Sequence, residues 1–156
     1  MANWPKISIN TGMSDSLCFG CGENNPIGLK LSFKWDGKTA RAEATPSKLY
    51  QGWPGIVHGG IITSMLDEAM SYAVRFEGMN CLTAKMQIEF KRPALIDEPL
   101  VITSSVTRNG KRVVKTKASI FTRDGTLMAE GTATHFVIET KPDEVNNKED
   151  KFQGNV

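Results

Sequence analysis

One segment of this chain has residue types and spacing that could do chemistry. It contains two glycines, the first of which lies eight residues before an acidic residue. The segment opens His58-Gly59-Gly60 and continues as an apolar helix pattern that contains Asp67. A helix N-terminus presents unpaired backbone N–H groups and the positive end of its dipole, and glycine lets a ligand oxygen approach that backbone closely. The segment therefore offers an oxyanion site and a carboxylate, a combination that suits attack on an activated carbonyl group.

The helix after the glycines is predicted to have two distinct faces, because successive residues are ~100° apart. The apolar face comprises Ile62, Met65, Leu66, Ala69 and Ala73. The other face is small and polar and comprises Gly60, Thr63, Ser64, Asp67 and Ser71. A solvent-facing helix surface normally carries Lys, Glu and Arg, so we expect another surface or a ligand to pack on the small polar face. Glu68 points away from it.

Three glycine turns predict the strands that must position this helix. Asn-Gly and Asp-Gly between alternating apolar runs are strong hairpin signals, and they occur here at Asp36-Gly37, Asn109-Gly110 and Asp124-Gly125. The strands that these turns join are expected at 29–35, 38–44, 100–108, 111–121 and 127–138.

The helix itself is expected at about 59–76, and an alternating strand follows it at 82–91. One hairpin cannot cover a single apolar helix, so the sheet has to curl around it. The predicted fold class is α+β, with one long central helix wrapped by a curved antiparallel β-sheet.

Length and composition limit the class of protein. The 156 residues suit a single domain at 1–138, followed by a polar tail at 139–156 that we expect to be disordered. A net charge of +2 gives no case for binding nucleic acid or a membrane, and no apolar run approaches the ~20 residues of a membrane span. The odd number of cysteines and the absence of a secretory signal favour a reducing, cytoplasmic location.

Three motifs carry a family resemblance that covers about residues 17–137. The His-Gly-Gly triplet with Asp67 resembles the PaaI-like branch of the hotdog-fold acyl-CoA thioesterases. The segment from Cys18 to Gly22, with Asn25-Pro26-Ile27-Gly28-Leu29, resembles the N-terminal signature of a subgroup of that branch, and Gln51-Gly52-Trp53-Pro54-Gly55 resembles its pre-helix loop. The resemblance implies the hotdog fold and hydrolysis of an acyl-CoA to free acid and CoA, without a metal or organic cofactor. It also implies a homodimer or a dimer of dimers, with sites across the subunit interface.

The resemblance also assigns roles at the helix. The N–H of Gly59, next to Gly60, would donate to the thioester oxygen, and Asp67 would act as general base on water or attack directly to form a mixed anhydride. His58 is expected to position the loop rather than transfer protons, because Asp67 lies more than two helical turns away. Thr83, expected on the strand face opposite the apolar residues, would orient the water or the carboxylate.

Two further assignments concern water and coenzyme A. Many relatives hold the nucleophilic water with an Asn in the pre-helix loop, but Gly52 occupies that position here and Gln51 is one residue away, so the role is unassigned.

The turn that would clamp the phosphates of CoA comprises Arg108, Asn109, Gly110, Lys111 and Arg112. An ordinary exposed turn is the alternative, and other cations that could contribute are Lys85, Lys91 and Arg92.

The remaining reactive side chains are expected to be structural. Cys18 and Cys21 form a lone C-x-x-C, which cannot complete a four-ligand zinc site without further cysteines or histidines, so it is interpreted as a turn, with a labile disulfide as the minor alternative. His135 is expected to be structural, and Cys81 is expected in or near the core.

Two other functions remain open on the same fold. One is a non-catalytic protein that binds or senses acyl-CoA, against which the presence of Asp67 argues. The other is a dehydratase of hydroxyacyl thioesters, which would pair a site histidine with the acid, whereas His58 stands beside the glycines.

Overall fold

The computed structural model describes residues 17–138, so the predicted polar tail at 139–156 lies outside the described residues. In chain order the elements are β1 (Lys34–Trp35), β2 (Ala40–Ala44), the 3-10 helix η1 (Lys48–Tyr50), α1 (Gly59–Phe76), β3 (Cys81–Phe90), β4 (Leu100–Arg108), β5 (Val113–Thr122) and β6 (Leu127–Val137). Within this part of the chain, no helix is long and apolar enough to cross a membrane.

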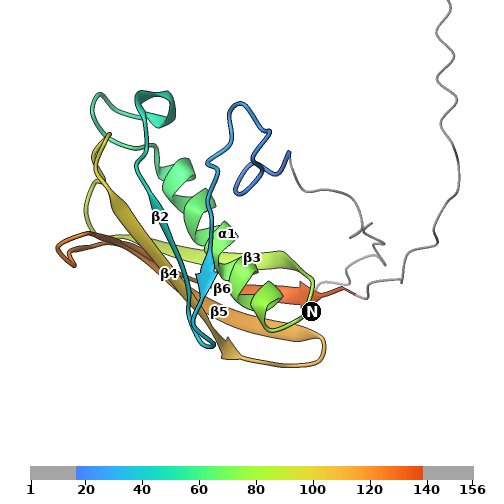
Figure 1. The fold of residues 1–156 in the computed structure, drawn as a ribbon. Coiled ribbons are helices and arrows are strands. Elements are labelled where there is room, and N and C mark those ends of the chain that lie inside the picture. Colours follow the sequence, from blue (N-terminus) through green and yellow to red (C-terminus); the bar gives the residue numbers. More distant parts are fainter. Residues whose placement is uncertain (1–16, 139–156) are drawn as a thin grey trace, which may run out of the picture.

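The strands form one antiparallel sheet that curves around α1. Their order across the sheet is β1-β2-β4-β5-β6-β3, which places β3 at one edge. Figure 1 shows α1 crossing one face of the sheet, with the segment before β1 passing over the outer side of the helix. The predicted α+β fold, one long helix wrapped by a curved antiparallel sheet, is confirmed.

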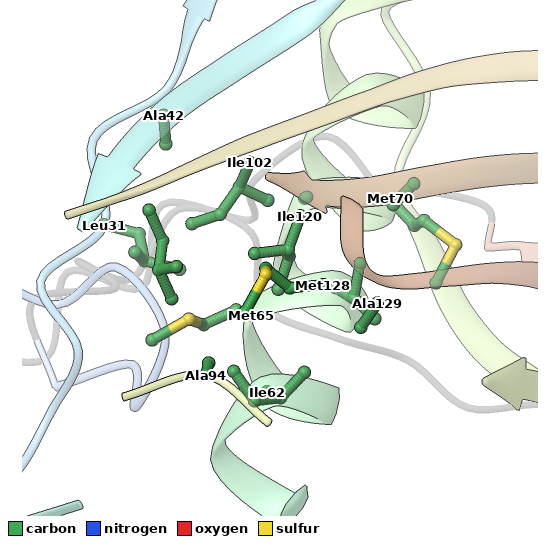
Figure 2. Close-up of a cluster of buried hydrophobic side chains, with 14 of the residues drawn as sticks. Leu31, Ala42, Ile62, Met65, Met70, Ala94, Ile102, Ile120, Met128 and Ala129 are labelled. Carbon is green, nitrogen blue, oxygen red and sulfur yellow. The ribbon is translucent and has the colours of Figure 1, made fainter. Parts of the chain in front are cut away.

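The apolar face of α1 forms the centre of the core. Its predicted members Ile62, Met65, Leu66, Ala69 and Ala73 are all buried. In Figure 2, helix side chains such as Met65 meet Ile102 and Ile120 of the sheet. Each large side chain buried in this way contributes roughly 1.5–3 kcal/mol. The opposite, small polar face of the helix is therefore held in a defined orientation.

The predicted first strand is largely wrong. Of the expected 29–35, only Lys34–Trp35 is a strand. Lys30 has a left-handed backbone (φ 52°), and the N–H groups on either side of it donate to an earlier turn: Leu29 to the Phe19 carbonyl at 2.8 Å and Leu31 to the Gly20 carbonyl at 2.9 Å. These backbone groups bond to the N-terminal turn instead of to a neighbouring strand. The segment consequently lies over α1.

Candidate functional site

Of the two glycine N–H groups at the start of α1, one is occupied and the other has no acceptor among the described residues. His58 is the N-cap, and its Nδ1 accepts from the N–H of Gly60 at 2.9 Å. A Cβ at residue 60 would lie 3.0 Å from that nitrogen, so glycine there leaves room for the cap. Within the described residues the N–H of Gly59 has no acceptor, and the residue is exposed. Gly59, rather than Gly60, is thus the donor available to a ligand.

A cleft of about 860 Å³ opens in front of this free N–H group. Its walls come from the pre-helix loop, the first residues of α1 and the segment that follows β3. Trp53 and Phe90 line it and are 80% and 56% exposed as residues, which is unusual for large aromatic residues. An apolar group of a ligand that reached Gly59 would find surface to cover here.

The amide of Gln51 lines the same cleft but is partly occupied. Its Oε1 accepts from the N–H of Gly55 at 2.8 Å, which stabilises the pre-helix loop. Gly52 has no side chain to hold water, and its N–H donates to the Ile56 carbonyl at 2.9 Å. Gly52, which stands where many relatives have an Asn, therefore offers no side chain to the nucleophilic water, and that role is assigned to no residue.

Asp67 belongs to a hydrogen-bonded row that runs from α1 into the sheet. The hydroxyl of Thr83 on β3 donates to Asp67 Oδ1 at 2.7 Å. The same hydroxyl oxygen lies 3.3 Å from Nδ1 of His135 on β6, whose Nε2 lies 2.8 Å from the hydroxyl of Thr116 on β5. Asp67 and Thr83 are half-buried, whereas His135 and Thr116 are 0% and 1% exposed. The row thus joins a solvent-accessible carboxylate to the core.

One set of proton positions satisfies the whole row. Thr83 has a single hydroxyl hydrogen, and donating it to Asp67 leaves its oxygen free to accept from Nδ1–H of His135. The Nε2 atom of that ring then accepts from the hydroxyl of Thr116. Burial lowers the pKa of His135 from its ordinary value, against an opposing effect of Asp67, so the ring is a neutral donor. Oδ2 of Asp67 is not used in this row.

The side chain of Thr83 reaches Asp67 because of a local irregularity in β3. Strict alternation places Thr83 opposite the apolar residues, and that expectation is wrong. The pairing of β3 with β6 shifts register between Thr83 and Lys85, so a β-bulge turns Thr83 toward α1, the side on which Met86 also packs.

Burial, reinforced by Asp67, raises the pKa of the neighbouring Cys81 thiol to about 11, so this cysteine is not a thiolate nucleophile.

The two chemical features of α1 are too far apart to act on one group from one subunit. Gly59 and Asp67 are separated by eight residues, which at ~1.5 Å per residue is roughly 12 Å along the axis. The residues between them include Thr63 and Ser64, whose hydroxyls donate to the Gly59 and Gly60 carbonyls at 2.9 and 2.8 Å.

The cationic turn lies at the Asp67 end of the sheet. Arg108, Asn109, Lys111 and Arg112 are exposed, and a Cβ at Gly110 would lie 2.6 Å from the Val113 carbonyl, so the turn needs glycine there. The turn joins β4 to β5, and β5 is two strands from β3, or roughly 10 Å at the usual strand spacing.

The alternative cations lie apart from that turn. Lys91 forms ion pairs with Glu89 and, at 3.0 Å, with Glu130. Arg92 donates to the Leu127 carbonyl at 2.9 Å. Both line the cleft at the Gly59 end, and Lys85 is exposed on β3.

Comparisons with known proteins agree with this architecture. Residues 54–129 match the model of the Thioesterase superfamily. The acyl-coenzyme A thioesterase THEM4 of Bos taurus is 32% identical over 131 residues, covering 82% of this chain and 54% of that protein. The chain spans about half the length of the curated relatives it matches.

Solved structures extend the likeness to the fold. A hypothetical thioesterase of Streptococcus pneumoniae TIGR4 with coenzyme A superposes with a TM-score of 0.67 at 18% identity, over 72% of this chain and 88% of that one. The E. coli PaaI protein from the phenylacetic acid degradation operon superposes with a TM-score of 0.66 at 22% identity, over 69% and 83%. The fold of this chain is the hotdog fold of thioesterases.

Proposed function

We propose that this protein is an acyl-CoA thioesterase, which hydrolyses an acyl-CoA to the free acid and CoA. The observation that carries the proposal is the Asp67–Thr83 hydrogen bond on a helix whose first N–H group, at Gly59, has no acceptor among the described residues. The match to the Thioesterase superfamily and the likeness to THEM4 support the same activity.

The complete site needs two subunits. Gly59 and Asp67 are equally far from Thr63, so two α1 helices that cross antiparallel at Thr63 bring Gly59 close to Asp67 of the partner subunit. The small residues on this face let two helices approach closely, and the internal bonds of Thr63 and Ser64 leave few polar groups to desolvate. Two-fold closure is also the commonest symmetry of homo-oligomers.

The sheet edge supports the same assembly. β3 is ten residues long and pairs only with β6 among the described strands, so its outer backbone groups face outward. A long open edge favours pairing with another chain. Pairing of β3 with β3 of the partner subunit would extend the sheet and give either a dimer or a dimer of dimers.

The proposed reaction assigns one task to each group. The Gly59 N–H and the dipole of α1 polarise the thioester carbonyl, a contribution of roughly 3 kcal/mol for one oxyanion donor. Asp67 then takes a proton from water through the free Oδ2, or attacks the carbonyl itself to form a mixed anhydride that water opens. In either route the C–S bond breaks and CoA leaves as a thiolate that takes up a proton. His135 holds the Thr83 hydroxyl, and that hydroxyl holds Asp67.

The substrate would lie across the interface, with its acyl side on the subunit that supplies Gly59 and its CoA side on the subunit that supplies Asp67. The cleft with Trp53 and Phe90, beside Gly59, suits the apolar acyl side of the thioester. The exposed cations Arg108, Lys111 and Arg112 suit the phosphates of CoA. We place the protein in the PaaI-like branch and in the cytoplasm; its His-Gly-Gly cap, its likeness to PaaI and its three free cysteines support this assignment.

Thiol release from a panel of acyl-CoAs tests the function directly. We expect steady release of free CoA with at least one straight-chain or aromatic acyl group, at a rate that scales with enzyme concentration. Tight binding of acyl-CoA without release would favour a binding or sensing protein instead. Formation of an enoyl product without free CoA would favour a dehydratase, and either result would refute the proposal.

A further inference from the structure

The N-terminal C-x-x-C turn lies against Glu68 of α1, which points about 100° around the helix from Asp67 and its hydrogen-bonded row. Figure 1 shows the stretch between this turn and β1 passing over the helix. Sγ of Cys18, Sγ of Cys21 and a carboxylate oxygen of Glu68 lie within 4.8 Å of one another. Glu68 comes from the helix, 47 residues beyond Cys21 in the chain. The third ligand that the sequence pattern lacks is therefore supplied by the fold.

The turn is shaped to receive the carboxylate. The N–H of Gly22 donates to the Cys18 carbonyl at 2.9 Å and closes the turn. At Gly20 a Cβ would lie only 2.4 Å from Cδ of Glu68, so a residue with a side chain there would displace the acid. The bonds from Leu29 and Leu31 to the carbonyls of Phe19 and Gly20 hold the turn in place. The two sulfurs and the acid are thus brought together by several independent contacts.

The spacing of the ligand atoms fits a tetrahedral zinc ion. Zn–S bonds of about 2.3 Å and Zn–O bonds of about 2.0 Å at tetrahedral angles place sulfur and oxygen roughly 3.5 Å apart. Sγ of Cys18 lies 3.7 Å from Oε1 of Glu68. Two sulfurs and one carboxylate favour zinc over Mg²⁺ or Ca²⁺, which prefer oxygen ligands throughout.

We propose that Cys18, Cys21 and Glu68 bind a zinc ion, with water as the fourth ligand. Binding replaces the protons of the two thiols, so two protons are released and no redox partner is involved. The ion ties the N-terminal turn to α1 and stabilises the fold; it takes no part in hydrolysis. The site is separate from the Asp67–Thr83 pair, so the zinc proposal and the thioesterase proposal can fail independently.

Metal analysis of untagged, full-length protein purified without chelators tests the site. We expect zinc close to one ion per chain by mass spectrometry, and a thiolate-to-cobalt charge-transfer band when Co²⁺ replaces it. Cys18→Ser, Cys21→Ser and Glu68→Gln should each lower zinc affinity tenfold or more. Cys81→Ser is the matched thiol control and Glu77→Gln the matched carboxylate control, and both should keep the ion.

A second measurement covers variants that fail to fold. Wild-type protein freed of metal by chelation should bind added Zn²⁺ in a calorimetric titration, release protons on binding and show a raised Tm. The absence of zinc from purified protein together with no cobalt band on titration would overturn the proposal. So would equal zinc content in the Cys18→Ser and wild-type proteins, or a thiol count showing that Cys18 and Cys21 are joined as a disulfide.

Discussion

Replacing Thr83 with valine tests whether the hydrogen-bonded row behind Asp67 matters for turnover. Valine keeps the shape of threonine and removes only the hydroxyl, which donates to Asp67 at 2.7 Å and lies 3.3 Å from His135. A hydrogen bond to a charged group is worth about 1.5–3 kcal/mol. If that energy holds the carboxylate in its reactive orientation, kcat should fall roughly 10- to 150-fold.

The same substitution has a second, independent consequence for stability. Without the hydroxyl, Nδ1–H of the buried His135 loses its acceptor, which costs about 1–3 kcal/mol of unfolding free energy. Thr83→Ser restores the hydroxyl and should recover most of both losses. Urea unfolding and thiol-release kinetics on the two variants measure these effects separately.

A double-mutant cycle with Asp67→Asn distinguishes positioning from direct action. Asp67→Asn alone should lower kcat by about 10² or more with little change in KM, because the carboxylate acts only in the transition state. If Thr83 acts through Asp67, adding Thr83→Val to Asp67→Asn should cost almost nothing further in kcat. Fully additive losses, or a Thr83→Ser variant as slow as Thr83→Val, would refute the reasoning.

Three further predictions follow from the geometry. Reversing the charges of Arg108, Lys111 and Arg112 together should raise KM for acyl-CoA at least about tenfold, with a much smaller change in kcat. Added salt should raise the KM of the wild-type protein in the same way. An unchanged KM in the triple variant would show that CoA docks elsewhere. Because burial lowers the pKa of His135, the unfolded chain binds a proton that the folded chain does not. The free energy of unfolding should therefore decrease as pH falls through about 6.5. The His135→Gln variant should lack this part of the pH dependence when urea unfolding is measured across pH. Thr63→Arg at the proposed two-fold contact should give monomers by light scattering and abolish turnover, whereas an active monomer would contradict the shared site.

The sequence predicts best the elements that are specified locally. The helix at Gly59–Phe76 has the expected bounds because its start is marked by a capping residue and two glycines, and because Gly78 (φ 82°) follows its last turn. The end of β4 and the start of β6 also agree, since glycine turns set these two ends. Such signals need no knowledge of distant contacts.

The features that were missed all depend on pairing between distant segments. The sequence predicts a structural role for His135, but nothing near it in the sequence indicates Thr83, its partner across the β3–β6 ladder. The bulge that turns Thr83 toward α1 interrupts an alternation that the sequence shows as regular. Likewise Lys30 leaves the expected strand only because the Cys18–Gly22 turn supplies carbonyls for its neighbours. Local patterns contain no information about these partners.

Asp67 and Glu68 are adjacent, yet they connect α1 to different parts of the molecule. Consecutive helix residues point ~100° apart, so Asp67 meets β3 while Glu68 meets the N-terminal turn. A metal bound by Glu68 would therefore fix the outer side of the same helix turn that presents the carboxylate. Removing zinc should lower Tm and leave kcat nearly unchanged when it is measured well below Tm, because the Asp67–Thr83 bond does not pass through the ion. A parallel loss of kcat would mean that the N-terminal turn sets the position of α1 over β3.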